Sequence, residues 1–175
     1  MSGNGSGSTG PAKGVCYQHG NFSQQVEKIR EHYQIESSDV DLPAFPLFGL
    51  FNAAMGVSSI IPRMDPSRPA QVDPEEIIRP IQQWQVTQSF GSPALWEAVG
   101  RRCHEKQIQL PSLRRVLSAG APVPLRVLQR VSAAIAPDGE MFTPYGATEA
   151  LPVASISASD RLALADRKAE LGKGI

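Results

Sequence analysis

Residues 86–119, with the sequence VTQSFGSPALWEAVGRRCHEKQIQLPSLRRVLSA, contain the pattern that decides the fold. Residues 86–90 and 113–119 are interpreted as short strands. Between them, Ser92 and Pro93 form a helix start, because a serine caps the first turn and a proline suits its first position. The helix that follows is expected to bury Leu95, Trp96, Val99 and Cys103. A strand, a helix and a strand in this order predict a βαβ crossover with parallel strands.

Upstream of this unit the pattern is helical at two places. Residues 22–33 have apolar side chains at helical spacing with polar residues between them, which predicts an amphipathic helix. The Asp-Pro-Glu sequence at 73–75 combines a cap, a first-turn proline and an acidic residue, and so begins another helix. That helix is expected to bury Ile77, Ile78, Ile81 and Trp84.

Downstream the alternation continues. Pro124 opens a helix, residues 140–143 form a short strand, and a charged helix spans roughly 159–171. The helix after Pro124 turns four apolar residues inward: Val127, Leu128, Val131 and Ile135. The chain is therefore expected to be α/β, with alternating strands and helices and a mainly parallel sheet. In such sheets the loops after strands, here at Gly120 and Tyr145, lie at one edge, where ligands bind.

One stretch is long enough to raise the question of a membrane span. Residues 42–62, LPAFPLFGLFNAAMGVSSIIP, carry no charge over about the length of a bilayer crossing. Three prolines and two glycines would interrupt a spanning helix, so a buried strand, a short helix and a second buried strand fit better. Within it, residues 45–48 and 57–61 are strand-like apolar runs.

Composition limits the classes of partner. The 175 residues suit about one domain, and 17 Lys and Arg balance 17 Asp and Glu, so the net charge is zero. Nucleic acids and anionic membranes reward a basic surface, so neither is expected as the main partner. Arg114 and Arg115 are interpreted as a solvated strand edge.

Other residues with reactive side chains give no site of their own. Cys16 and Cys103 are far apart, and they are expected to be reduced, buried thiols of a cytoplasmic protein. The first residues lack the basic and apolar regions of a secretory signal. The three histidines have no metal-ligand spacing and are expected at the surface: His19, His32 and His104.

Two short motifs could bind a nucleotide. Residues 6–14, SGSTGPAKG, could form a nest of backbone N–H groups around phosphate, with Lys13 neutralising charge, although a flexible linker explains the same composition. Residues 145–149, YGATE, offer an aromatic ring for a base, a hydroxyl for a phosphate oxygen and a carboxylate for Mg²⁺. Taken alone, this second motif also fits a turn followed by a surface glutamate.

Together the motifs resemble those of the adenylate-forming superfamily, which contains acyl-CoA synthetases, nonribosomal-peptide adenylation domains and luciferases. Residues 6–14 resemble its phosphate loop, and residues 145–149 its adenine- and magnesium-binding motif. Residues 118–122, SAGAP, are similar to its adenine-edge loop, and residues 45–48, FPLF, to a segment lining its acyl pocket. The four occur in the family's order and rough spacing.

The resemblance implies a role for each matching residue. ATP would be bound by the phosphate loop through Ser6, Gly7, Ser8, Thr9, Gly10 and Lys13. Gly120, Ala121 and Pro122 would border the adenine, with Tyr145 stacked on it and Gly146 beside it. Thr148 would contact the α-phosphate and Glu149 would bind Mg²⁺, and these two residues with Lys13 are the catalytic candidates.

The resemblance also implies a domain assignment and a reaction. Residues 1–14 would be the phosphate-binding loop and residues 15–175 a partial AMP-binding domain, part of the large domain of such an enzyme, without the C-terminal lysine-bearing domain. The runs at 40–56 and 143–156 look most similar to the fatty-acid-ligase-like branch of bacterial olefin biosynthesis, the β-lactone synthetases. The family pattern is broken at Gly5, Ala12 and Gly49, where Thr or Ser, Pro and His are usual.

The expected activity is ATP-dependent conversion of a fatty or 3-hydroxy fatty carboxylate into an acyl-adenylate, which then closes to a β-lactone. An alternative is an acyl-CoA ligase, with CoA as a further partner and a thioester as product. A second alternative is a catalytically incomplete fragment, lacking the remainder of a longer chain, that binds nucleotide without turnover or has no function.

Overall fold

The computed structural model of the chain describes residues 2–5, 13–147 and 149–172. Its main feature is a six-stranded sheet with the order β4-β3-β5-β6-β7-β8. Neighbouring strands are parallel except for the last pair, β7 and β8. The strands are β3 (Val40–Pro43), β4 (Ser58–Ser59), β5 (Gln88–Gly91), β6 (Arg115–Ser118), β7 (Glu140–Ala147) and β8 (Ala150–Ser157). The prediction of a mainly parallel α/β sheet is confirmed. A separate antiparallel pair joins β1 (Ser2–Gly5) to β2 (Lys13–Cys16).

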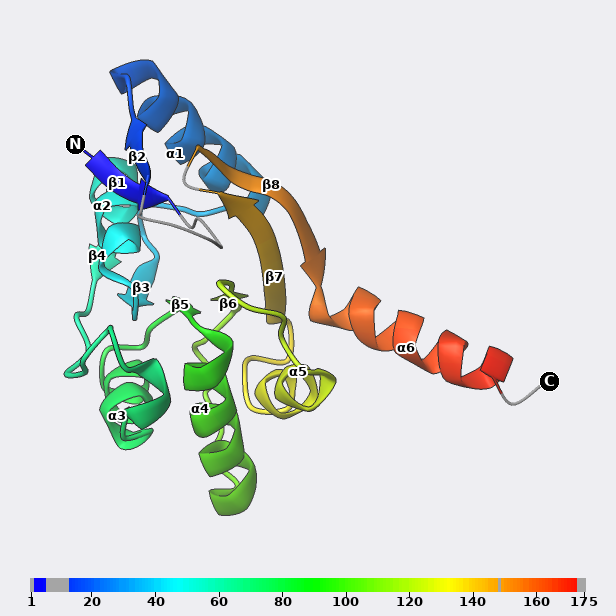
Figure 1. Cartoon of the computed structure of the whole chain (residues 1–175). Coiled ribbons are helices and arrows are strands. Elements are labelled where there is room, and N and C mark those ends of the chain that lie inside the picture. The colour runs from blue at the N-terminus through cyan, green and yellow to red at the C-terminus, as the bar shows by residue number, and fades with distance from the viewer. Residues whose placement is uncertain (1, 6–12, 148, 173–175) are drawn as a thin grey trace.

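Helices cover both faces of the sheet (Figure 1). One face carries α1 (His19–Tyr33) and α2 (Pro46–Met55). The other carries α3 (Glu75–Gln83), α4 (Pro93–Lys106) and α5 (Leu125–Ser132). A short 3-10 turn, η1 (Pro69–Gln71), precedes α3, and α6 (Ala158–Gly172) reaches away from the body of the domain.

Each face of the sheet has its own apolar core. Phe90 and Leu117 pack under α1 and α2, against Ile29 and Phe51 among others. On the opposite face, the sheet contributes Leu42, Val116 and Met141 to a larger core with α3, α4 and α5. Successive strand residues therefore alternate between two buried faces, each covered by helices.

The predicted helix starts are confirmed. The Oδ1 atom of Asp73 accepts a hydrogen bond from the backbone N–H of Glu75 at 3.0 Å, and the Ser92 hydroxyl accepts one from Leu95 at 3.3 Å. Both helices bury the expected apolar faces, with one exception. Trp84 is 54% exposed, because α3 ends at Gln83 and the chain turns away before the tryptophan can join the buried stripe.

The uncharged stretch at 42–62 has the expected order of strand, helix and strand, but the boundaries differ. Residues 45–48 are not a strand, because Pro46 begins α2. The helix ends at Met55, and Gly56 caps it with a left-handed backbone conformation. The second strand, β4, is only two residues long and both are exposed. Among the residues the structure describes, no helix is long and apolar enough to cross a bilayer.

Two expectations about reactive side chains are wrong. Cys16 is exposed, whereas Cys103 is buried and its thiol pKa is raised by burial to about 11. Arg115 is not at a solvated strand edge. Its Nη1 donates at 3.0 Å to Asp39, which is 1% exposed, and at 2.8 Å to Gln88. The arginine ties the loop before β3 to strands β5 and β6, because a buried carboxylate requires a charged partner.

Asp39 collects hydrogen bonds from several elements. Besides Arg115, it accepts from the hydroxyl of Thr87 at 2.7 Å, from Arg114 at 3.3 Å and from the backbone N–H of Glu36 at 2.9 Å. Burial alone would raise the pKa of Asp39, but the hydrogen bonds from Glu36, Thr87 and Arg115 and the charge of Arg115 lower it below its ordinary value. The carboxylate thus stays ionised and joins the amino ends of three strands.

Replacing Asp39 with alanine is expected to reduce the free energy of unfolding by about 3 kcal/mol or more, because Arg115 then remains largely buried without its anion. Urea denaturation of the chain measures this change. Asp65→Ala is the control, since Asp65 is exposed and its partners are local, and it should leave the free energy of unfolding nearly unchanged. Equal losses in the two variants would contradict the role given to Asp39.

Candidate functional site at the carboxyl edge of the sheet

The parallel strands end together along one edge. Pro43, Phe90, Leu117 and Phe142 lie in register across β3, β5, β6 and β7. Phe45 and Gly120 follow this row by two or three residues, just beyond the ends of β3 and β6. Tyr145 follows it by three residues within β7, so all three come from the same edge. The expectation that the segments near 120 and 145 share an edge is confirmed by the parallel pairing of β6 and β7, although Tyr145 lies within β7 and not in a loop.

The loop after β6 begins with a glycine that its conformation requires. Gly120 has a φ of +95°, in the region that disfavours side chains, and a Cβ built on it would have no atom within 4 Å. Ala121 and Pro122 after it are exposed. The loop therefore presents open backbone and small side chains.

The second motif is not a loop after a short strand, as the sequence suggested. Strand β7 extends through Tyr145 to Ala147 and forms an antiparallel hairpin with β8, with an irregular register between these two residues. Gly146 is needed there, since a Cβ would lie 2.7 Å from the carbonyl oxygen of Ala150. The Tyr145 side chain is left 73% exposed at the edge.

Glu149 lies at the turn of this hairpin, beside the first half of α1. A cavity of about 510 Å³ opens between them, lined by Glu149 and by polar α1 residues that include Gln24 and Lys28. Sequence reasoning missed these α1 residues, because side chains on an exposed helix face carry no motif of their own. The cleft places one carboxylate opposite one lysine, which is paired with Glu31 at 2.7 Å.

Part of the predicted site lies outside the described residues. These are Ser6, Gly7, Ser8, Thr9 and Gly10 of the first motif and Thr148 of the second. The backbone of Lys13 is described, as the first residue of β2. Gln18, five residues after it, lines the same cavity as Glu149. Five residues span at most about 18 Å, so the backbone of Lys13 lies no farther than that from Gln18.

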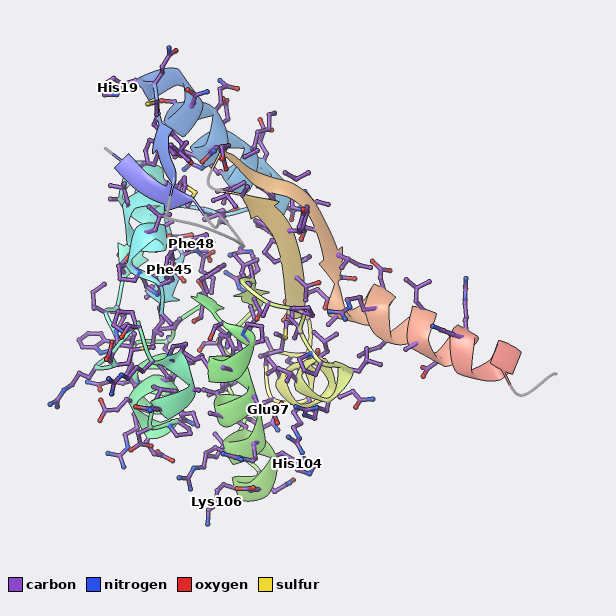
Figure 2. The ribbon with its side chains drawn as sticks, viewed as in Figure 1. His19, Phe45, Phe48, Glu97, His104 and Lys106 are labelled. Carbon is purple, nitrogen blue, oxygen red and sulfur yellow. The ribbon has the colours of Figure 1, made fainter. Side chains whose placement is uncertain are left out.

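An apolar surface adjoins this edge at the start of α2. Phe45 is 48% exposed, and Leu47 and Leu50 are each 39% exposed. Beneath them, Phe48 stacks on Phe90 of β5 with ring centroids 3.7 Å apart. Figure 2 shows Phe45 and Phe48 together on this side of the sheet, while His104 and Lys106 lie at the far end of α4.

The inner side of α2 is held by buried polar groups. Asn52, 2% exposed, donates from Nδ2 to Asp41 Oδ2 of β3 at 2.5 Å and to Ser59 Oγ of β4 at 3.0 Å. Burial raises the pKa of Asp41 from 3.8 to about 7, despite the hydrogen bonds from Asn52 and from the Leu42 backbone, which lower it. Asp39 raises it slightly further.

Other titratable residues form no second centre. All three histidines, His19, His32 and His104, are exposed, as expected. No group of three or more His, Cys, Asp or Glu side chains that could hold a metal occurs within residues 2–5, 13–147 and 149–172.

Comparison with known proteins identifies relatives along most of the chain. The family model described as AMP-binding enzyme matches residues 5–173. An olefin β-lactone synthetase from Stenotrophomonas maltophilia is 48% identical over 151 residues, and one from Xanthomonas campestris pv. campestris is 46% identical. Each match covers 86% of this chain but only 27% and 26% of the relative. The chain thus spans about a quarter of the length of these relatives.

Solved structures agree on the fold. An o-succinylbenzoate coenzyme A synthetase from Bacillus subtilis, solved in complex with AMP, matches with a TM-score of 0.70 at 22% identity. The match covers 90% of this chain and 32% of the other. A luciferase-like enzyme from the mealworm Zophobas morio matches with a TM-score of 0.71 at 19% identity, over 94% of this chain and 38% of its own.

The raised pKa of Asp41 predicts that the chain loses stability as the pH rises. Between about pH 4 and pH 7 the folded chain keeps a proton that the unfolded chain has lost, so this group lowers the free energy of unfolding as the pH rises. Above pH 7 its effect becomes constant. Asp41→Asn removes the titration, and its stability relative to wild type should therefore increase from pH 4 to pH 7.

Denaturation at several pH values measures this difference. Asp138→Asn, at an exposed aspartate, is the control and should follow the wild-type curve closely. Parallel curves for Asp41→Asn and the wild type would contradict the raised pKa.

Proposed function

Because this chain belongs to the AMP-binding enzyme family, we propose that the full-length protein uses ATP to activate a fatty or 3-hydroxy fatty carboxylate as an acyl-adenylate and then closes it to a β-lactone. The main support is the common edge of the sheet, which combines a candidate nucleotide site at Gly120 and Tyr145 with the apolar surface at Phe45. An acyl-adenylate, with a nucleotide at one end and a hydrocarbon chain at the other, requires that combination.

The nucleotide would bind across β6 and β7. The exposed ring of Tyr145 is available to stack on adenine, and the open backbone at Gly120 allows a base to approach closely. Phosphates would lie toward the turn of the hairpin at Glu149, and Thr148 and Lys13 are proposed as further ligands. The first motif, through Ser6, Gly7, Ser8, Thr9 and Gly10, would hold the β- and γ-phosphates of ATP.

The first reaction needs positioning more than covalent chemistry. A carboxylate oxygen of the substrate attacks the α-phosphorus, a new P–O bond forms, and the bond to pyrophosphate breaks as pyrophosphate leaves. Orientation and charge neutralisation then determine the rate. Glu149 would hold Mg²⁺, which when bound neutralises phosphate charge, and Lys13 would add a second positive charge.

The hydrocarbon part of the substrate would lie on α2. Phe45, Leu47 and Leu50 expose apolar area beside the nucleotide edge, and such area is costly to leave in water. An acyl chain covering it would be held by burial alone. The polar head would remain at the ends of the strands.

The product is proposed from the relatives. In the lactone reaction the 3-hydroxyl oxygen of the substrate attacks its own acyl carbon, AMP leaves and the hydroxyl proton is released. In the ligase reaction the thiol of CoA attacks instead. Olefin β-lactone synthetases are 46–48% identical to this chain, whereas a feruloyl-CoA synthase from Amycolatopsis is 30% identical, which favours the lactone. Because the reaction consumes ATP, we assign it to the cytoplasm.

Product analysis of the full-length protein distinguishes the two reactions. With ATP, Mg²⁺ and a 2-alkyl-3-hydroxy fatty acid, a β-lactone and AMP are expected without CoA, and adding CoA should leave the product unchanged. A matched acid without the 3-hydroxyl should stop at the acyl-adenylate. If the product is instead a thioester that forms only with CoA, the protein catalyses the ligase reaction and the proposed lactone reaction is wrong.

Glu149→Ala in the full-length protein should reduce the rate of ATP–pyrophosphate exchange by on the order of 10²-fold or more, because the placement of Mg²⁺ is worth about 3 kcal/mol in the transition state. Glu105→Ala, an exposed glutamate near the far end of α4, is the matched control and should leave the rate unchanged. An unaltered rate for Glu149→Ala would remove this residue from the site.

A further inference from the structure

We propose that the polar cluster formed by the buried residues Asp41 and Asn52 with Ser59 at its outer end fixes the position of α2 on the sheet and thereby determines which acyl chains the protein prefers. This inference rests on the proposed function, in which the acyl chain lies on α2. The three residues would be positioning residues, since they act through the helix and do not face the exposed apolar surface.

The cluster joins three elements through one amide. Asn52 of α2 donates both of its hydrogen bonds from Nδ2, to Asp41 of β3 and to Ser59 of β4. The backbone of β3 and the end of β4 are also tied together, because the N–H of Ile60 donates to the carbonyl oxygen of Asp41 at 2.8 Å. The amide therefore has fixed acceptors on both sides, and α2 cannot slide or rotate without breaking at least one bond.

Apolar packing alone would fix the helix less strictly. Phe51 and Met55 of α2 are buried against α1 and the sheet, but contacts of this kind are non-directional and tolerate small shifts. A buried hydrogen bond is directional, and an unpaired Asp41 or Asn52 in this position would be unfavourable. The polar cluster therefore fixes one position of α2 among several in which the helix would bury a similar apolar area.

The placement of α2 matters for the acyl chain and not for the nucleotide. Phe48 stacks on Phe90, and Leu47 and Leu50 expose the surface on which the chain would lie. Gly120 and Tyr145 are carried by β6 and β7 instead. A shift of α2 should therefore change how strongly KM depends on the length of the acyl chain and leave the affinity for ATP unchanged.

The interaction does not need one protonation state. Asp41 accepts from Asn52 whether its carboxyl is ionised or neutral. The charged groups that act on it are Asp39 and Arg115, which pair with each other. The positioning effect is therefore expected at every pH at which the protein is folded.

The experiment measures acyl-chain selectivity in the full-length protein. ATP–pyrophosphate exchange is followed with saturated fatty acids that differ by two methylene groups. On a well-placed apolar surface each methylene group contributes about fourfold to affinity, so KM should fall along the series. In Asn52→Leu this fall should flatten to about twofold or less per methylene group, while KM for ATP stays within about twofold of wild type.

Conservative variants separate positioning from folding. Asp41→Asn keeps an acceptor for Asn52 and should retain the wild-type selectivity. Asn52→Asp places two carboxyl groups together and should lose it, and the double variant Asp41→Asn with Asn52→Asp restores one donor and one acceptor and should regain it. Ser59→Ala removes one of the two acceptors of Asn52 and should also flatten the selectivity. Ser58→Ala, on the neighbouring serine, is its control and should retain the wild-type selectivity.

The outcomes are distinguishable. Flattened selectivity with unchanged KM for ATP, rescued in the double variant, supports the inference. Wild-type selectivity in folded Asn52→Leu and in Asn52→Asp would overturn it and leave the proposed function intact. Absence of exchange in the wild type with every fatty acid would overturn the proposed function, and the inference with it.

Discussion

The parallel register of β3, β5, β6 and β7 is the constraint on which the other features depend. Because these strands run in the same direction, their carboxyl ends, and the segments that begin with Phe45, Gly120 and Tyr145, must share one edge. Each crossover returns over a face of the sheet, so both faces become buried. The candidate site is thus a consequence of strand direction before any side chain is considered.

Polar and apolar residues divide the face under α1 and α2 into two rows. Asp41, Gln88, Arg115 and Glu140 lie in register across four strands, and two residues further along lie Pro43, Phe90, Leu117 and Phe142. The polar row is at the amino side of the strands, where Asp39 pairs with Arg115. The apolar row is next to the carboxyl edge. Polar groups that would be unfavourable near a hydrocarbon ligand are therefore satisfied at the other end of the same strands.

Most of the fold could be predicted from the sequence, because local signals decided it. Caps at Asp73 and Ser92 and the apolar stripes that follow them fixed helices α3 and α4. The sequence is misleading where contacts between distant segments determine the secondary structure. Residues 45–48 look like a strand by composition, yet Pro46 and the left-handed Gly56 enclose a helix. Strand β8 contains Pro152 and small side chains and was not predicted, because its pairing with β7 is a non-local property.

The candidate site also combines residues that the sequence reveals with residues that it does not. Gly120 and Tyr145 could be found because they follow strands and match a spaced family pattern, whereas Asn52 could not. An asparagine inside an apolar run carries no sign of its partner, and Asp41 is eleven residues earlier in a strand. Nucleotide contacts are thus carried by loops with recognisable motifs, and acyl contacts by a helix whose position depends on a buried amide. Because the two groups are on different elements, substitutions near α2 could alter the preferred hydrocarbon while the nucleotide edge stays the same. That separation gives a physical reason why one fold can serve relatives that act on chemically different carboxylates.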